Sequence, residues 1–182
     1  MVLSIDTYWS SVVRRAYAVI GRFIVNDISA GTIDPAMLPT VGELKLQYVA
    51  MHIKGTPETM QDLADYQDVT ADVIDYFKEF ESRASDAGIE DWILDPGFGF
   101  AKTLEQNYEL LSHLSDLNAF LRPILVGVSR KSMIYRKFNI SPEDSLPATQ
   151  VLHLLALERG ADILRVHDVA EARRTIELYK IV

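Results

Sequence analysis

The chain has 182 residues and a formal net charge of −8, and 48% of its residues are hydrophobic. This composition predicts a folded globular domain, and the acidic balance argues against a nucleic-acid partner, because phosphate binding needs clustered Lys and Arg. The absence of Cys excludes thiolate chemistry and fits a cytoplasmic protein, and no apolar run approaches the roughly 20 residues of a membrane span.

Six short apolar segments are predicted to be strands. They lie near Val2–Ile5, Phe23–Val25, Tyr48–Met51, Trp92–Leu94, Ile124–Val126 and Ile163–Val166. Amphipathic segments separate them. Short strands that are apolar throughout, alternating with helices, are typical of a parallel sheet whose outer face is covered.

Four of the intervening segments place apolar residues at helical spacing. These residues are Val73, Ile74, Phe77 and Phe80 within 71–87; Leu104, Tyr108, Leu111 and Leu114; Ala148, Val151, Leu152, Leu155 and Ala156; and Val169, Ala172, Ile176 and Tyr179. Gly88 and Gly160 are expected to end two of these helices. Because no linker or low-complexity segment interrupts the pattern, we predict one α/β domain over residues 1–182.

Polar or glycine-containing clusters follow each predicted strand. They are Ser4–Thr7, Asn26–Gly31, Met51–Pro57, Asp95–Phe100, Gly127–Ser132 and Arg165–Asp168. A doubly wound open sheet fits six strands by count, but it has its site at one switch point. A barrel gathers all the carboxyl ends of its strands at one mouth. We therefore predict a parallel (β/α) barrel of TIM type.

Several of these strand-end residues suggest ligand chemistry. The Asp95-Pro96-Gly97-Phe98-Gly99-Phe100 loop offers a carboxylate, with backbone able to approach a flat ligand and aromatic side chains beside it. Arg165 and His167 share one face of a strand by the period of two, so both side chains are expected at the mouth. For Asp27 and Asp168, a helix cap or a turn is as good an interpretation as a functional role.

The histidines divide into two groups by position. His113 and His153 lie within predicted helices and are interpreted as surface or packing residues. His52 and His167 follow strands, where a functional role is more plausible for each.

Taken together, the motifs resemble dihydropteroate synthase. They are Asn26–Ser29, Met51–Pro57, Asp95–Thr103, Ser129–Ser132 and Arg165–Asp168, in that family's order and spacing, and Ser4–Thr7 matches its third strand. The resemblance covers essentially the whole chain and implies strands three to eight of the eight, an incomplete barrel that lacks about two βα units at its N-terminal side. We expect pterin recognition to be encoded here, and turnover to be poor or absent unless another chain or segment completes the barrel.

The resemblance also implies which residues bind substrate. They are Asp6, Asn26, Ile28, Met51, Asp95, Phe100, Lys131, Ser132, Arg165 and His167. Asp95 accepts hydrogen bonds from the pterin, Asn26 and Asp6 join it in the pocket, and Ile28, Met51 and Phe100 form its apolar walls. Lys131, Arg165 and His167 are the implied catalytic residues. Lys131 contacts the pterin carbonyl and, with Ser132, the p-aminobenzoate. Arg165 lies against the pterin and, with His167, holds the diphosphate.

The implied activity condenses 6-hydroxymethyl-7,8-dihydropterin diphosphate with p-aminobenzoate to give 7,8-dihydropteroate and diphosphate, in folate biosynthesis. Mg²⁺ is the implied cofactor, although the family's metal contact belongs to a loop outside this sequence, so no metal ligand is expected among these residues. A homodimer is also implied. The alternatives are a truncated non-catalytic pterin-binding paralogue and a pterin-dependent methyltransferase barrel. The roles of Lys54, Lys102 and Arg130 are left open.

Overall fold

The computed structural model describes residues 2–56 and 59–182, so the end of the Met51–Pro57 motif lies outside the described residues. Its sheet is built from six parallel strands. They are β1 Ser4–Asp6, β2 Ile24–Asp27, β3 Gln47–Met51, β4 Trp92–Asp95, β5 Leu125–Val126 and β6 Ile163–Leu164. Strands β1 to β4 form one ladder and β5 pairs with β6, while a bridge between Leu94 and Ile124 joins the two ladders. The order across the sheet therefore follows the order along the chain.

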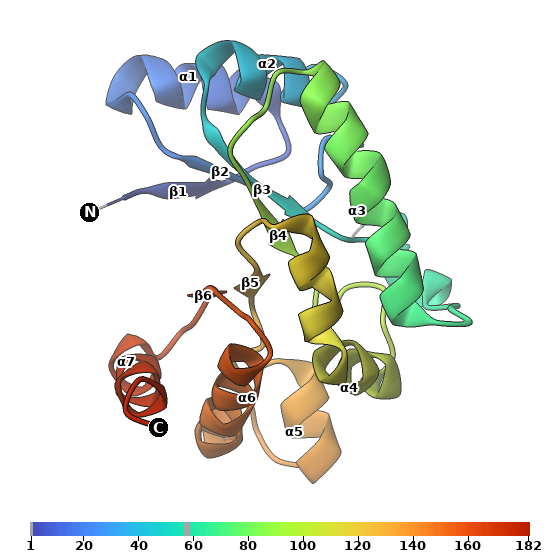
Figure 1. Cartoon of the computed structure of the whole chain (residues 1–182), viewed down its shortest axis with the longest axis vertical. Helices are drawn as coiled ribbons and strands as arrows, with labels where there is room; N and C mark the ends of the chain where they lie inside the picture. The colour runs from blue at the N-terminus through green and yellow to red at the C-terminus, as the bar shows by residue number, and fades with distance from the viewer. Residues whose placement is uncertain (1, 57–58) are drawn as a thin grey trace.

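Seven α-helices connect and follow these strands in the described ranges. They are α1 Ser10–Ile20, α2 Met37–Leu44, α3 Val69–Asp86, α4 Leu104–Ser112, α5 Ser132–Phe138, α6 Leu146–Glu158 and α7 Val169–Tyr179, with short 3₁₀ helices at Met60–Leu63, Leu114–Phe120 and Glu143–Ser145. Figure 1 shows the helices as an arc around the outside of the strands. None of the described helices is both long and apolar enough to cross a membrane.

The arc is open on one side. Among the described residues β1 pairs only with β2, and β6 only with β5, so these two strands are the edges of the sheet. In Figure 1 the gap in the ring of helices lies between the N-terminus and α7. A barrel strand is paired on both sides. The incomplete parallel barrel predicted from the sequence is therefore confirmed.

The outer face of the sheet carries the main hydrophobic core. Trp92 of β4 lies under α3, where its ring packs edge-on against Phe80 at 5.0 Å and stacks on Phe77 at 6.2 Å between centroids. Both phenylalanines are fully buried. They belong to the apolar face predicted for this helix, so the predicted packing of this segment is confirmed.

The inner face carries a smaller apolar layer with a polar layer above it. Val49, Ile93 and Leu125 form the apolar layer, with Ile24 and Ile163 against it. Two residues further along each strand the side chains return to the same face. Those positions, one from each strand or its extension, are Asp6, Asn26, Met51, Asp95, Gly127 and Arg165. The carboxyl ends of all six strands thus supply one shared surface.

The structure corrects several predicted boundaries. Strand β1 begins at Ser4, two residues later than predicted, and β6 ends at Leu164, two residues earlier than predicted. Both are edge strands, and each has only one neighbour to pair with among the described residues. Helix α3 begins at Val69, because the Asp68 carboxylate caps it by accepting a hydrogen bond from the Ala71 amide at 2.9 Å. The helix predicted to reach Leu114 ends at Ser112 and gives way to a 3₁₀ helix.

Candidate functional site

Asp95 is the most deeply buried acid on the shared surface at the strand ends. Only 1% of the residue is exposed. Its Oδ1 accepts a hydrogen bond from the Gly97 amide at 2.9 Å, whereas Oδ2 is buried without a hydrogen-bond partner in the described part of the chain. The nearest cation to Oδ2 is Arg165, whose Nη2 lies 3.9 Å away. Because an unpaired buried acceptor is costly, Oδ2 is available to a ligand that donates hydrogen bonds.

The loop after Asp95 is held in one conformation by close contacts. Gly97 has φ +72°, and a Cβ there would overlap the carbonyl oxygen of His52, so this position needs glycine. The Gly99 amide donates to Asn107 Oδ1 at 2.6 Å. Of the two aromatic residues expected beside a ligand, Phe98 is instead fully buried in the core, and only Phe100 is partly accessible.

Lys131 approaches this loop from the amino end of α5. Its ammonium donates to the Phe98 carbonyl oxygen and lies 4.8 Å from the centre of the Phe100 ring. Burial lowers the pKa of Lys131 to about 8, although the Asp95 carboxylate opposes that shift. Lys131 is therefore a partly desolvated donor within the electrostatic reach of Asp95 and Arg165.

Arg165 and His167 come from the chain that leaves β6. The guanidinium of Arg165 crosses over Gly127, where an added Cβ would lie 3.2 Å from Nε, so the missing side chain leaves its path open. His167 is exposed, and its Nδ1 lies 3.0 Å from Ser129 Oγ. The structure thus places one cation against Asp95 and one imidazole at the rim.

The remaining predicted residues lie along the same strand ends. Asn26 Nδ2 donates to Asp6 Oδ1 at 2.6 Å. Met51 is buried and pairs in register with Asp95 across β3 and β4. Ser132 begins α5, and Ile28 lies half-buried after β2.

The predicted residues thus fall into groups. Asp95 pairs with Arg165 at 3.9 Å, and Lys131 lies over the Phe100 ring. Asp6 and Asn26 form a hydrogen-bonded pair. The polar contacts described above do not involve Ile28.

Asp27, which the sequence left open, has a structural role. This fully buried carboxylate accepts hydrogen bonds from the amide and hydroxyl of Ser29, from the Gly31 amide and from the Tyr48 hydroxyl, all within 2.9 Å. Both oxygens of Asp27 therefore accept hydrogen bonds from the protein, and they hold the loop after β2 in place.

Asp168 and two of the unassigned cations are also engaged in the protein. Arg130 binds Asp168 in a bidentate pair at 2.7 and 2.8 Å, which lowers the pKa of that carboxyl group. Lys54 lies 3.6 Å above the Tyr66 ring and 3.0 Å from an Asp72 oxygen. These contacts account for Arg130 and Lys54 as structural side chains.

Lys102, whose role the sequence left open, is a buried residue of the site. It is 5% exposed, and its Nζ lies 2.9 Å from Nδ1 of His52, which is also buried. Burial lowers the pKa of Lys102 to about 7 and holds the pKa of His52 well below its usual value. A lysine two residues beyond an aromatic–glycine loop carries no signal of burial, so nothing in the sequence distinguishes it from a surface cation.

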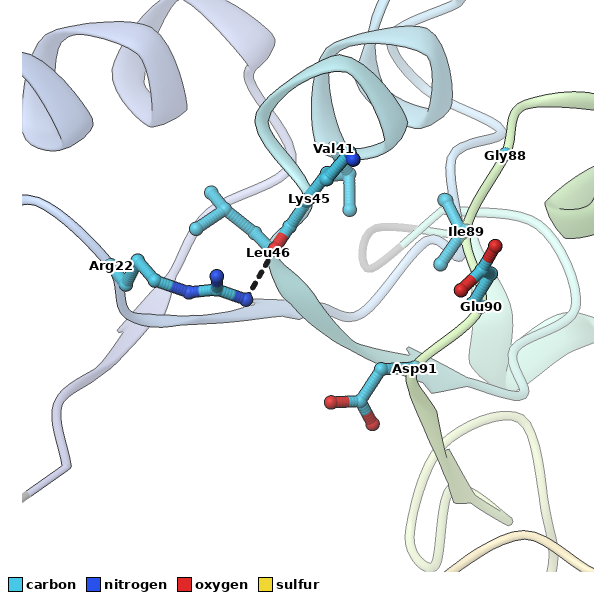
Figure 2. Close-up of a pocket in the computed structure, with 8 residues that line it drawn as sticks. All are labelled: Arg22, Val41, Lys45, Leu46, Gly88, Ile89, Glu90 and Asp91. Carbon is cyan, nitrogen blue, oxygen red and sulfur yellow. Dashed lines mark hydrogen bonds between the residues drawn. The ribbon is translucent and has the colours of Figure 1, made fainter.

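Pockets occur at both ends of the strands. One of about 450 Å³ lies beside the Asp95 loop, and its walls are Gly99, Lys102, Thr103, Leu104, Asn107, Ser132, Met133 and Arg136. Another lies at the amino ends of β3 and β4 (Figure 2), where Arg22 donates to the Lys45 carbonyl oxygen at 2.8 Å. Sites in (β/α) barrels form at the carboxyl ends. The first pocket therefore continues the candidate site, and the second is on the opposite end.

The part of the chain that the structure describes contains no cluster of side chains that could hold a metal ion. No group of three or more His, Asp or Glu side chains in residues 2–56 and 59–182 is placed to hold an ion. The described residues therefore do not fit a protein-bound Mg²⁺, and we assign no catalytic step to one.

Comparison with known proteins agrees with this geometry. Residues 1–167 match the family described as pterin binding enzyme, and the chain belongs to that family. The dihydropteroate synthase of Escherichia coli K12 is 42% identical over 182 residues, which cover 99% of this chain and 63% of the relative, and that of Shigella flexneri matches equally. The resemblance to dihydropteroate synthase predicted from the motifs is thereby confirmed.

Solved structures agree in fold. A Yersinia pestis dihydropteroate synthase, solved with a sulfonamide drug, superposes with a TM-score of 0.94 at 35% identity, over 100% of this chain and 66% of that one. A Thermus thermophilus dihydropteroate synthase, in complex with 4-aminobenzoate, gives 0.94 at 34% identity, over 100% and 71%. The chain thus spans roughly two thirds of the length of these relatives and follows their fold throughout.

Proposed function

We propose that the chain carries the pterin-binding part of a dihydropteroate synthase, the enzyme that joins 6-hydroxymethyl-7,8-dihydropterin diphosphate to p-aminobenzoate. The observation that carries this proposal is the buried Asp95 carboxylate, whose Oδ2 has no hydrogen-bond partner among the described residues. A pterin presents an amino group and a ring N–H side by side, and a carboxylate is acceptor-only and matches such a pair. Asn26 and Lys131 supply the polar contacts around the ring, with Phe100, Met51 and Ile28 as its apolar surroundings.

The diphosphate of the substrate is assigned to Arg165 and His167. Arg165 offers a planar set of donors that matches phosphate oxygens, and its charge is only partly satisfied by Asp95 at 3.9 Å. His167 adds a second donor from the same segment of chain. Arg165 thus supplies a local positive charge in a protein whose net charge is −8.

The proposed reaction is a substitution at the pterin methylene carbon. The C–O bond to the diphosphate breaks, the bonding electron pair leaves with the diphosphate, and the ring stabilises the cation. The amino nitrogen of p-aminobenzoate then forms the new C–N bond and loses a proton. Arg165 and His167 stabilise the departing negative charge, which is the electrostatic contribution that lowers such a barrier. Lys131 and Ser132 orient the p-aminobenzoate.

Three further properties are part of this proposal. Mg²⁺ is proposed as a cofactor of the reaction, without a ligand among the described residues. A homodimer and a cytoplasmic location are proposed from the family resemblance. The relatives reported above carry the synthase name, so neither the methyltransferase nor the non-catalytic paralogue gains support from them.

Ligand competition tests the proposal. A fluorescent pterin bound to the chain should be displaced by 6-hydroxymethyl-7,8-dihydropterin diphosphate more effectively than by 5-methyltetrahydrofolate, because only the former places an anion at Arg165. Stronger displacement by 5-methyltetrahydrofolate would instead favour the methyltransferase alternative.

A further inference from the structure

Lys102 and His52 form a buried polar pair directly behind the Asp95 loop. Lys102 Nζ has three close partners: His52 Nδ1 at 2.9 Å, the Gly97 carbonyl oxygen at 3.1 Å and the Phe100 carbonyl oxygen at 3.1 Å. The two carbonyls belong to opposite ends of one loop. A single ammonium therefore ties both ends of that loop to the same point.

The donors and acceptors of this cluster match in number. An ammonium group donates three hydrogen bonds and accepts none, so both carbonyls and His52 Nδ1 act as acceptors. While Lys102 is protonated, His52 is therefore the neutral tautomer that carries its proton on Nε2. Its ring packs edge-on against Tyr76 at 4.8 Å, and the Tyr76 hydroxyl bonds the Met51 carbonyl oxygen at 3.2 Å, so neighbouring side chains fix the imidazole.

The anchored loop determines which way Asp95 faces. Gly97 uses its amide for Asp95 Oδ1 and its carbonyl for Lys102, so the two peptide groups on either side of its Cα are both held. The His52 amide donates to the Asp95 carbonyl oxygen at 2.9 Å, which joins β3 to β4 at the same point. With Oδ1 held by the loop, Oδ2 is the oxygen left open.

Burying the ammonium of Lys102 costs desolvation free energy. Burying a lysine without full compensation is unfavourable, and burial is the largest cause of the lowered pKa of Lys102, while Asp95 acts in the opposite direction. The exposed lysines of the chain face no such penalty. The hydrogen bonds to the loop carbonyls and the negative charge of Asp95 therefore stabilise the buried ammonium of Lys102.

We propose that Lys102, held by His52, is a positioning residue that fixes the Gly97–Phe100 loop so that Asp95 Oδ2 and the Phe100 ring face a pterin. This inference rests on the proposed function. It adds a residue whose ammonium is bound by the protein itself and which determines the shape of the surface that contacts the ligand.

The first test is Lys102→Met in the full chain, titrated calorimetrically with 6-hydroxymethylpterin. Methionine keeps much of the apolar stem and removes all three donors. We expect the affinity to fall at least tenfold. Lys78→Met is the matched control, because Lys78 is exposed and its salt bridge is to Asp75 on its own helix, and its affinity should equal that of the wild type. An unchanged affinity of folded Lys102→Met, even with a lowered melting temperature, would overturn the proposal.

Two substitutions at His52 separate acceptor chemistry from packing. His52→Asn keeps an oxygen acceptor near the place of Nδ1, whereas His52→Leu fills the space without one. We expect His52→Asn to bind the pterin within about threefold of the wild type and His52→Leu to bind about tenfold more weakly. Equal losses in the two variants would contradict an acceptor role for His52.

A measurement on the wild-type chain keeps the test independent of variant folding. Nitrogen NMR of the histidine rings at pH 6 should show His52 as a neutral ring with its proton on Nε2, and a proton on Nδ1 would overturn the anchoring. Failure of the wild type to bind 6-hydroxymethylpterin would overturn the proposed function. Normal wild-type binding with no loss in Lys102→Met would overturn this inference alone.

Discussion

Asp95 and Arg165 lie on neighbouring parts of one sheet face, with the guanidinium Nη2 3.9 Å from the carboxylate Oδ2. The two residues are 70 positions apart in the sequence. The distance is longer than that of a hydrogen-bonded ion pair, so each group retains capacity for a ligand. A molecule that donates to Asp95 and carries an anion toward Arg165 satisfies both, which is the arrangement of donors and charge in a pterin diphosphate.

Arg165→Gln is predicted to weaken binding of the diphosphate-bearing pterin more than binding of the pterin alone. Loss of a charged donor to phosphate costs about 1.5–3 kcal/mol, equivalent to a tenfold to hundredfold loss of affinity. Calorimetry should therefore show that loss for 6-hydroxymethyl-7,8-dihydropterin diphosphate, and a change within about threefold for 6-hydroxymethylpterin. Equal losses for the two ligands would contradict a role of Arg165 in holding the diphosphate.

Gly97→Ala is predicted to destabilise the fold more than a comparable glycine substitution elsewhere. Both Gly97 and Gly88 have φ above +70°, but an added Cβ overlaps the His52 carbonyl only at Gly97 and meets nothing within 4 Å at Gly88. Urea denaturation should give a loss of about 1 kcal/mol for Gly88→Ala, from backbone strain alone, and at least about twice that for Gly97→Ala. Similar losses at the two positions would mean that the loop moves away freely from His52.

Acid is predicted to destabilise the protein through its buried histidines. Burial lowers the pKa of His153 to about 4 and that of His52 well below 6.5. Between the folded and unfolded pKa values the unfolded chain binds more protons, so the free energy of unfolding falls as the pH falls below 6.5. His153→Leu should remove on the order of 1 kcal/mol of the loss measured between pH 7 and pH 5.

The control for this pH dependence is Leu152→Ala, because Leu152 is buried in the same helix and carries no titratable group. It should lower the unfolding free energy at both pH values and leave the difference between pH 7 and pH 5 as it is in the wild type. A steeper loss in His153→Leu than in the wild type would contradict the burial of a neutral imidazole at that position.

Much of the fold was predictable because strand and helix patterns are local. All six strands and the four helices named from apolar spacing are present, with shifts of a few residues at their ends. Helices α1, α2 and α5 were not specified in advance: α2 contains Pro39 and Gly42, and α5 has only seven residues. The short or interrupted patterns of α2 and α5 gain stability from packing, which spacing along the chain does not report. This reason does not apply to α1, which has eleven residues without Gly or Pro.

The sequence could predict the role of a site residue only where that residue type, at the end of a strand, usually has a single role. Asp27 and Asp95 look alike in sequence, since each ends an apolar strand before a glycine-containing loop. The structure separates them, because Tyr48, Ser29 and Gly31 occupy the oxygens of Asp27, whereas one oxygen of Asp95 has no hydrogen-bond partner among the described residues. That difference depends on contacts across the sheet. The burial of Lys102 against His52, fifty residues earlier, depends on the same kind of contact.

The most direct measurement is the calorimetric titration of the wild-type chain and of Asp95→Asn with 6-hydroxymethylpterin. Asparagine keeps an oxygen that accepts from the Gly97 amide, so the loop should persist, but its second group is a donor that opposes the donors of the pterin. The wild type should bind one equivalent, and Asp95→Asn should bind at least a hundredfold more weakly with the loop intact. Equal binding by the two proteins would contradict the claim that the gathered strand ends form a pterin site around Asp95.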